Sequence, residues 1–224
     1  MIDIIQSFMI KQWALFSVFL FIILTLIFLS EFLYHKKNYS PKIFRALIHF
    51  FVGIGISFSP FIFESFTHPV LLAIIFLSIN LFSYKNNRLK SFHDIDRDSL
   101  GTIFFPISFI ILAIPFWESK YFISSSFMIL AISDPLASII GTYYKKAHFY
   151  KISKEKKSVE GSFIMFLSTF ILLFFLSSYI FNGLSFIESI IAIFICSIFI
   201  TISELISFKG SDNLSIPVTA FMFI

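Results

Sequence analysis

The residue best suited to chemistry is Asp134, an acid that lies inside an apolar run directly before a proline. An ionisable side chain within a hydrophobic segment is costly and marks a functional site by default. Ser138, Gly141 and Lys145 follow Asp134 at helical spacing, so a helix would place all four residues on one face. An acid, a hydroxyl, a bare backbone and a cation on one face would suit the binding of a phosphate group.

The sequence Ser133-Asp134-Pro135 also predicts a break in the helix that carries it. A residue before proline is disfavoured in helical geometry, whereas proline suits the first position of a helix and aspartate suits the cap before it. A helix that restarts at Pro135 would offer free N–H groups and a positive dipole end, and both attract phosphate. The alternative interpretation is a kinked helix in which Asp134 is only a cap.

A second group of candidate residues precedes the next apolar run, in the segment 156–161 with the sequence KKSVEG. Ser158 is a suitable N-cap for the following helix, and Glu160 would add negative charge to its first turn. Lys156 and Lys157 would neutralise phosphates, while Glu160 holds a divalent ion or orients a hydroxyl. The alternative is a capped helix at the membrane edge, with lysines attracted to anionic lipid head groups.

Further polar residues lie within apolar runs or near their ends. Arg45 and His49 are four residues apart, so they share a helical face and could clamp a phosphate group. Asp212 and Asn213 follow the last long apolar run. Glu204 lies inside that run, and its sequence context favours a structural and a functional interpretation equally.

The composition shows that these residues belong to an integral membrane protein. Of the 224 residues, 58% are hydrophobic and 13% are charged, and the mean hydropathy is +0.92. Soluble domains are about 25% charged, so a soluble protein of this composition would have too little polar surface. The single cysteine, Cys196, cannot form an intramolecular disulfide. The chain length fits one integral membrane domain over residues 1–224.

The apolar runs predict an all-α polytopic bundle of about seven transmembrane helices, the fifth broken at Asp134-Pro135 and the first peripheral. A helix needs roughly 20 residues to cross the hydrocarbon core. The stretch 216–224 is too short to cross alone, and the run at 69–84 is short. The seven apolar runs lie at residues 13–33, 46–63, 69–84, 100–117, 121–144, 162–181 and 186–208.

The basic residues predict the orientation of the bundle. Segments 34–45, 84–99 and 143–161 and the position after the seventh run carry all of the 17 Lys and Arg residues except Lys11 and Lys120. Seven alternating spans place these segments on one side of the membrane. The positive-inside rule then predicts cytoplasmic basic loops and an external N-terminus, in a multi-pass protein of a prokaryotic plasma membrane.

Together these motifs resemble the polytopic CTP-dependent lipid kinases, which include dolichol kinase, phytol kinase and fungal-type diacylglycerol kinase. The resemblance extends over residues 45–217. It rests on four motifs in the order of the family: Arg45 to His49, Asp134 to Gly141, Lys157 to Gly161, and Asp212 to Pro217.

The resemblance implies transfer of the γ-phosphate of CTP to the hydroxyl of a membrane lipid alcohol of the polyprenol, phytol or diacylglycerol type. Mg²⁺ or another divalent cation would take part. Asp134, Glu160 and Asp212 are expected to hold the metal, and one of them could instead accept the hydroxyl proton. The residues expected to bind the nucleotide are Arg45, His49, Ser138, Gly141, Lys156, Lys157, Ser158, Gly161 and Asn213.

Two other functions are considered. A phosphatidate cytidylyltransferase also uses CTP, but its Asp-x-x-Asp pair within a Gly-Pro-Gly-rich segment is not visible in this sequence. A small transporter would be expected to carry inverted repeats with paired broken helices, and we find no convincing repeat. The lipid bilayer is the expected environment, no nucleic-acid partner is expected, and the sequence does not indicate an oligomeric state.

Overall fold

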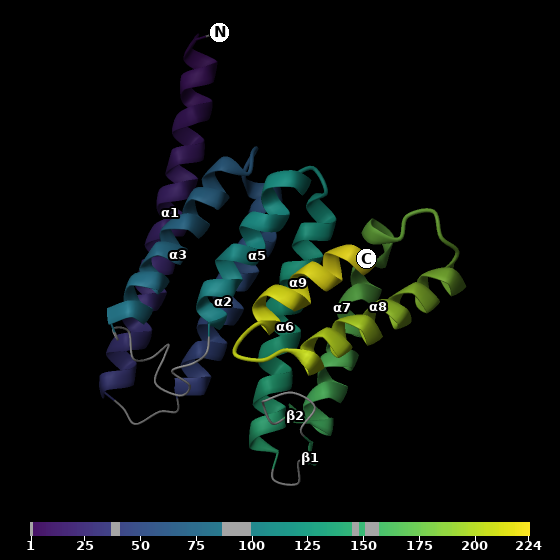
Figure 1. Cartoon of the computed structure of the whole chain (residues 1–224). Helices are drawn as coiled ribbons and strands as arrows, with labels where there is room; N and C mark the ends of the chain where they lie inside the picture. The colour runs from purple at the N-terminus through teal and green to yellow at the C-terminus, as the bar shows by residue number, and fades with distance from the viewer. Residues whose placement is uncertain (1, 37–40, 87–99, 145–147, 151–156) are drawn as a thin grey trace.

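The computed structural model describes residues 2–36, 41–86, 100–144, 148–150 and 157–224, without the side chains of residues 2–8, 30, 33–36, 41–45 and 150. This part of the chain is a bundle of helices (Figure 1). Its helices are α1 (Ile2–Lys36), α2 (Pro41–Ile62), α3 (Thr67–Asn86), α5 (Gly101–Phe116), α6 (Lys120–Tyr143), α7 (Val159–Ile180), α8 (Phe186–Ile206) and α9 (Asp212–Phe223).

The predicted polytopic helical bundle is confirmed. Among the described residues, five segments are long and apolar enough to cross a membrane, and they lie in α1, α3, α6, α7 and α8. The apolar parts of α2 and α5, over Ala46–Ile62 and Gly101–Phe116, are shorter than a full span. All seven predicted runs are therefore helical, and five of them meet the length that a crossing helix needs. With 12 residues, α9 is too short to cross alone, as expected for the C-terminal stretch.

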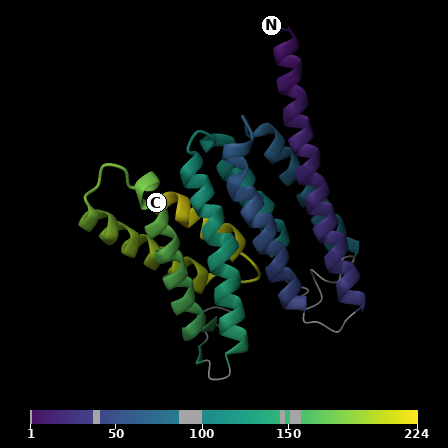
Figure 2. The same cartoon turned by 180° about the vertical axis from the view of Figure 1, so that it is seen from behind.

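The centre of the bundle is α6, which packs against α2, α7 and α9. In its most apolar window 61% of the residues are buried, against 22% in α1 and in α7. At the edge of the bundle, α1 packs mainly on α2 and α3 (Figures 1 and 2). Large apolar side chains such as Phe163 and Phe175 of α7 are exposed, as lipid-facing side chains would be. These contacts make α6 the element on which a site would be assembled.

The helix termini next to the basic segments lie at one end of the bundle. The C-termini of α1, α3 and α6 and the N-termini of α2 and α7 all point to the lower end in Figure 1. This arrangement agrees with the alternation expected from the sequence. The orientation of that end relative to the cell stays a prediction.

The predicted break at Asp134-Pro135 is wrong, because α6 continues through it from Lys120 to Tyr143. Proline removes the hydrogen bond that its nitrogen would give to the Ala131 carbonyl. Membrane helices tolerate this loss where neighbouring groups support the helix. Here α2 supplies that support, since Gly53 contacts Ala131 closely and His49 bonds to the Leu130 carbonyl. A helix N-terminus that could bind phosphate therefore does not exist at Pro135.

A short antiparallel strand pair departs from the all-helical prediction. Phe149–Tyr150 forms β1 and Lys157–Ser158 forms β2, with Tyr150 opposite Lys157. This hairpin connects α6 to α7 at the lower end of the bundle in Figure 1. Because β2 leads directly into α7, it fixes the position of Lys157 against the helices.

Candidate functional site

Lys157 lies where β2 meets three helices. Its ammonium group donates a hydrogen bond to Glu204 Oε1 of α8, and only 13% of the Lys157 side chain and 9% of the Glu204 side chain are exposed. Burial alone lowers the pKa of Lys157, but the carboxylates of Glu204, Asp212 and Asp134 outweigh it and raise this pKa above its ordinary value. We call Lys157, Glu204, Asp212 and Asp134 the charged cluster.

A tight turn between α8 and α9 places Asp212 in the charged cluster. Lys209 and Gly210 both have positive φ, at 53° and 82°. Glycine adopts this conformation without steric cost, which a bulkier residue at position 210 would not. The Lys209 carbonyl accepts a hydrogen bond of 2.8 Å from Leu100 N, and this bond joins the turn to the start of α5. The first residue of α9 is therefore held by α5 as well as by α8.

Asp134 faces His49 of α2. Asp134 Oδ2 and His49 Nε2 are 4.0 Å apart, and the two side chains are 20% and 15% exposed. His49 Nε2 also lies 3.1 Å from the carbonyl oxygen of Leu130. Because a carbonyl only accepts, this bond requires the proton on Nε2. His49 thus connects α2 to the turn of α6 that precedes Asp134.

Glu160 bonds to His148 and is not among the carboxylates that raise the pKa of Lys157. Its two carboxylate oxygens accept hydrogen bonds from His148 N at 2.9 Å and from His148 Nδ1 at 2.7 Å. The backbone of Val159 also donates to the His148 carbonyl at 3.0 Å. Glu160 closes the base of the β1–β2 hairpin, and its predicted catalytic and metal-binding roles stay predictions.

Ser158, Gly141 and Gly161 form the closest contact between α6 and α7. Ser158 is the N-cap of α7, as predicted, and its hydroxyl accepts a 3.0 Å hydrogen bond from Gly161 N. A Cβ atom at Gly141 would lie 2.6 Å from Ser158 Oγ, and one at Gly161 would lie 3.0 Å from the Ala137 carbonyl. The two glycines permit this close packing, and their predicted contacts with a nucleotide stay predictions.

Three more residues that were predicted to bind the nucleotide are Ser138, Arg45 and Lys156. Ser138 is exposed on α6. Arg45 belongs to α2, but its side chain lies outside the described part. Lys156, like Lys145, lies outside the described residues altogether.

The three acids predicted to hold a metal do not form a ligand group by themselves. Within the described ranges, no three His, Cys, Asp or Glu side chains gather closely enough to hold a metal ion. Mg²⁺ at phosphate sites is usually held by one or two carboxylates together with the substrate phosphates. Asp134 and Asp212 both act on the same ammonium group from different helices, and their predicted metal-binding roles stay predictions.

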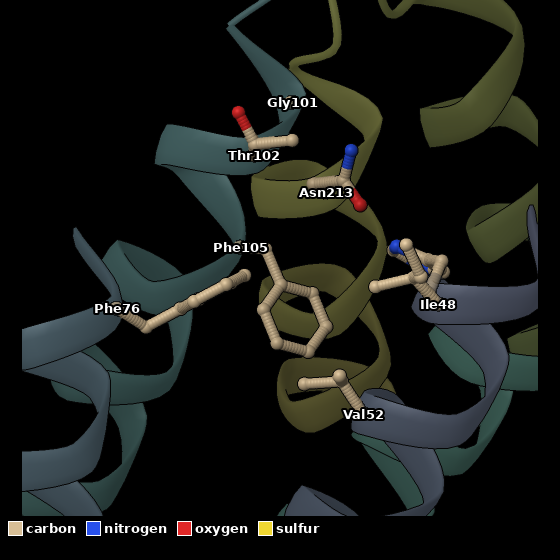
Figure 3. Close-up of a pocket in the computed structure, with 8 residues that line it drawn as sticks. Ile48, Val52, Phe76, Gly101, Thr102, Phe105 and Asn213 are labelled. Atoms are coloured by element: carbon tan, nitrogen blue, oxygen red, sulfur yellow. The ribbon is translucent and has the colours of Figure 1, made fainter. Parts of the chain in front are cut away.

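Beside the charged cluster lies a small cavity of about 30 Å³ between α2, α3, α5 and α9 (Figure 3). We call it the Asn213 cavity. Asn213 directly follows Asp212, so the cavity adjoins the charged cluster through one backbone step. Its lining is apolar at Ile48, Val52, Phe76 and Phe105, and polar at His49, Thr102 and Asn213.

Two features of this site could not be assigned from the sequence. Glu204 is an acid inside an apolar run, and its burial beside Lys157, with only 7% of the residue exposed, depends on how α8 packs. An isolated acid in a span is the signal that could have placed it in the site. The Asn213 cavity is formed by four helices and has no sequence signal of its own.

No family model matches the chain, and no solved structure matches it. Among curated proteins, a phytol kinase from a Synechocystis species is 26% identical over 190 residues, which cover 83% of this chain and 79% of that protein. The aligned length includes most of the bundle. The chain is therefore a multi-pass membrane protein that is distantly homologous to phytol kinase.

Proposed function

We propose that this protein is a lipid kinase that transfers the γ-phosphate of CTP to the hydroxyl of a membrane lipid alcohol. The observation that carries the proposal is the charged cluster, in which Lys157 and the carboxylates of α6, α8 and α9 meet at one end of a membrane bundle. The distant homology to phytol kinase supports the same reaction type. The basic segments adjoin this end, so the positive-inside rule would place the cluster on the cytoplasmic side.

The charged cluster supplies the parts that phosphoryl transfer requires. The reaction depends mainly on positioning and on neutralising the charge of the phosphates. Lys157 is a fixed cation, since Glu204 holds its ammonium group and burial limits its motion. It would contact the phosphates of the nucleotide. Such a charge-assisted contact contributes roughly 1.5–3 kcal/mol.

The carboxylates would accept the proton of the lipid hydroxyl and hold the divalent cation. In the proposed step the lipid hydroxyl oxygen bonds to the γ-phosphorus, the bond from that phosphorus to the β–γ bridging oxygen breaks, and CDP leaves with the bridging oxygen. The hydroxyl proton passes to the carboxylate of Asp134 or Asp212. A divalent cation held by these two carboxylates and the phosphates would neutralise charge on the nucleotide. His49 of α2 would support this arrangement, because its Nε2 bonds to the Leu130 carbonyl and lies 4.0 Å from the Asp134 carboxylate.

The decisive experiment is one assay of the purified full chain in detergent with Mg²⁺, a labelled nucleotide and a panel of lipid alcohols. Label carried from the γ-phosphate of CTP into the lipid is the expected result. ATP labelled in the same position tests the choice of donor. Label carried from the cytidine moiety would instead show a cytidylyltransferase, and no lipid labelling from any donor would overturn the proposal. Protein with Asp134→Asn, purified identically, is the matched control for contaminating activity.

A further inference from the structure

We propose that the Asn213 cavity holds the hydroxyl end of the acceptor alcohol, that the ligand is a single-chain alcohol, and that Asn213 Oδ1 receives its hydroxyl hydrogen bond. This inference rests on the proposed function, because it names the lipid site of that reaction. It also makes a claim about binding that can be tested without turnover.

The first observation is a buried acceptor without a partner. Asn213 is 4% exposed, and its Oδ1 atom is buried and makes no hydrogen bond in the described structure. A buried polar atom without a partner is uncommon and calls for an explanation. In Figure 3 the amide oxygen of Asn213 is turned to the side of the cavity where Ile48 and Val52 lie. The missing partner would therefore occupy the cavity.

The orientation of the Asn213 amide is fixed by its own nitrogen. Nδ2 donates to Asp212 Oδ1 at 3.1 Å and lies 3.4 Å from the Gly210 carbonyl oxygen. A flipped amide would place Oδ1 against these two acceptors. The atom left for a ligand is consequently an acceptor, and the ligand must bring a donor such as a hydroxyl group.

The lining of the cavity determines the class of alcohol. Apart from His49, Thr102 and Asn213, the side chains that line it are apolar. His49 Nε2 already donates to the Leu130 carbonyl. Thr102 Oγ1, like Asn213 Oδ1, is buried without a partner in the described structure, but Thr102 turns its methyl group to Asn213 and its hydroxyl away (Figure 3). The ester carbonyls of a diacylglycerol would find few donors here. The cavity itself, at about 30 Å³, has room for a hydroxyl group but not for a glycerol with two ester groups. A long-chain alcohol whose hydroxyl is its only polar group fits both observations.

The position of the cavity fits the acceptor of a phosphoryl group. Asp212 Oδ1 accepts hydrogen bonds from the backbone and the side chain of Asn213, so the two residues are held together at the start of α9. A hydroxyl bonded to Asn213 Oδ1 would lie next to a carboxylate of the charged cluster. The apolar chain would extend between α2, α3 and α5, past Val52, Phe76 and Phe105.

The test compares the binding of phytol with that of its methyl ether, which has the same chain but no hydroxyl hydrogen to donate. Binding to the purified full chain is measured by competition with a photoreactive phytol analogue. The wild-type protein is expected to prefer the alcohol by about tenfold. Asn213→Leu should remove most of this preference, since it removes the acceptor. Val52→Phe, which fills the apolar part of the cavity, should weaken the binding of both ligands about equally.

Thr169→Val is the matched control. Thr169 Oγ1 in α7 is also buried without a partner among the described residues, and Thr169 does not line the cavity. This variant removes an equally unpartnered oxygen and should leave the preference unchanged. Attachment of the photoreactive analogue to peptides of α2, α3 and α5 would support the inference. Attachment elsewhere, a preference that survives Asn213→Leu, or tighter competition by diacylglycerol than by phytol would overturn it.

Measurements of alcohol binding and of phosphate transfer distinguish a failure of this inference from a failure of the proposed function. If alcohols bind with a preference that depends on Asn213 but receive no phosphate, the cavity is correct and the kinase proposal fails. If phosphate is transferred and Asn213→Leu and Val52→Phe leave the KM for the alcohol unchanged, the kinase proposal holds and this inference fails.

Discussion

At the scale of single residues, the surroundings of Asp134 exclude the interpretation that it is only a helix cap. Its carboxylate lies on a continuous helix, 4.0 Å from His49 and within electrostatic reach of Lys157. Because α6 does not restart after it, Asp134 is not the cap of a helix. What remains is a charged group with partners from β2 and α2.

Asp134→Asn should therefore remove activity and leave the fold intact. The asparagine keeps the shape of the side chain but removes the charge that the proposed transfer requires. We expect a loss of kcat of at least about a hundredfold, which is typical when a preorganised electrostatic group is removed. Steady-state assay and thermal unfolding in detergent measure the two effects. Glu188→Gln, at the capped start of α8, is the control and should retain activity. Near-normal turnover of Asp134→Asn would contradict the catalytic role.

The pair of Lys157 and Glu204 makes a second prediction at this scale, tested by a double-mutant cycle. Removing one partner of a buried ion pair costs about 3–5 kcal/mol, because the other charge stays buried and unpaired. Lys157→Met and Glu204→Gln should each destabilise the protein, and the double variant should recover much of the loss. Thermal unfolding of the wild type, the two single variants and the double variant gives the coupling free energy between the two side chains. Additive losses would show that the two side chains do not form a pair in the membrane.

The same pair predicts a direction of pH dependence. The pKa of Lys157 is raised in the folded protein. Its contribution to stability is therefore fully present below the unfolded-state pKa of about 10.4 and is lost as the pH rises through the higher folded-state value. Unfolding measured between pH 7 and pH 9 should show no loss that depends on Lys157. A fall in stability between pH 7 and pH 9 that is absent from Lys157→Met would contradict the raised pKa of Lys157.

At the scale of elements, close helix packing explains why α6 continues past Pro135. Gly53 lets α2 approach α6, since a Cβ atom there would lie 2.6 Å from Ala131 Cβ and 3.2 Å from Ala131 Cα. This contact lies one turn before Pro135, where the helix has lost a hydrogen bond. The packing of α2 therefore contributes to the geometry of the charged cluster through α6.

Gly53→Ala should separate α2 from α6 and destabilise the bundle by about 1–3 kcal/mol, as overpacking does. Gly55→Ala on the same helix is the matched control. Its Cβ atom would meet only Phe19 Cε1, at an ordinary 3.7 Å, and helix propensity would favour the substitution by up to about 1 kcal/mol. Thermal unfolding of both variants in detergent measures the difference. Equal stability of the two would show that the α2–α6 contact is looser than described.

At the scale of the whole molecule, the proposed reaction requires the charged cluster to face the compartment that holds the nucleotide. The helix ends next to the basic segments gather at one end of the bundle. The loop between α7 and α8, which contains Asn182, lies at the other end (Figure 1). The charge distribution predicts that the first of these ends is cytoplasmic.

Cysteine labelling in intact cells tests this topology in a Cys196→Ser background. Asn182→Cys, in an exposed loop, should react with a membrane-impermeant reagent added outside. Ser153→Cys, in a segment outside the described residues, should react only after the membrane is opened. Labelling of position 153 from outside would show that the orientation is the reverse of the predicted one. The charged cluster would then have no access to cytoplasmic CTP.

The sequence by itself determined the class of the protein, the helical segments and most of the acidic candidates. Hydrophobic runs predict helices because each helix satisfies its own backbone in lipid, and the Ser158 cap depends on a residue only three positions away. Asp134 and Asp212 stood out because a charge at the end of an apolar run is costly wherever the helices pack.

Only the tertiary structure decided which of these residues act together. Lys157 and Glu204 are 47 residues apart, and no local pattern indicates that α8 brings one to the other. The continuity of α6 depends on the packing of α2 against it, which outweighs the local preference of the residue before Pro135. The Asn213 cavity likewise depends on the space that four helices leave between them. Contacts between distant segments arise from side-chain packing, whereas local sequence encodes only the segments that pack.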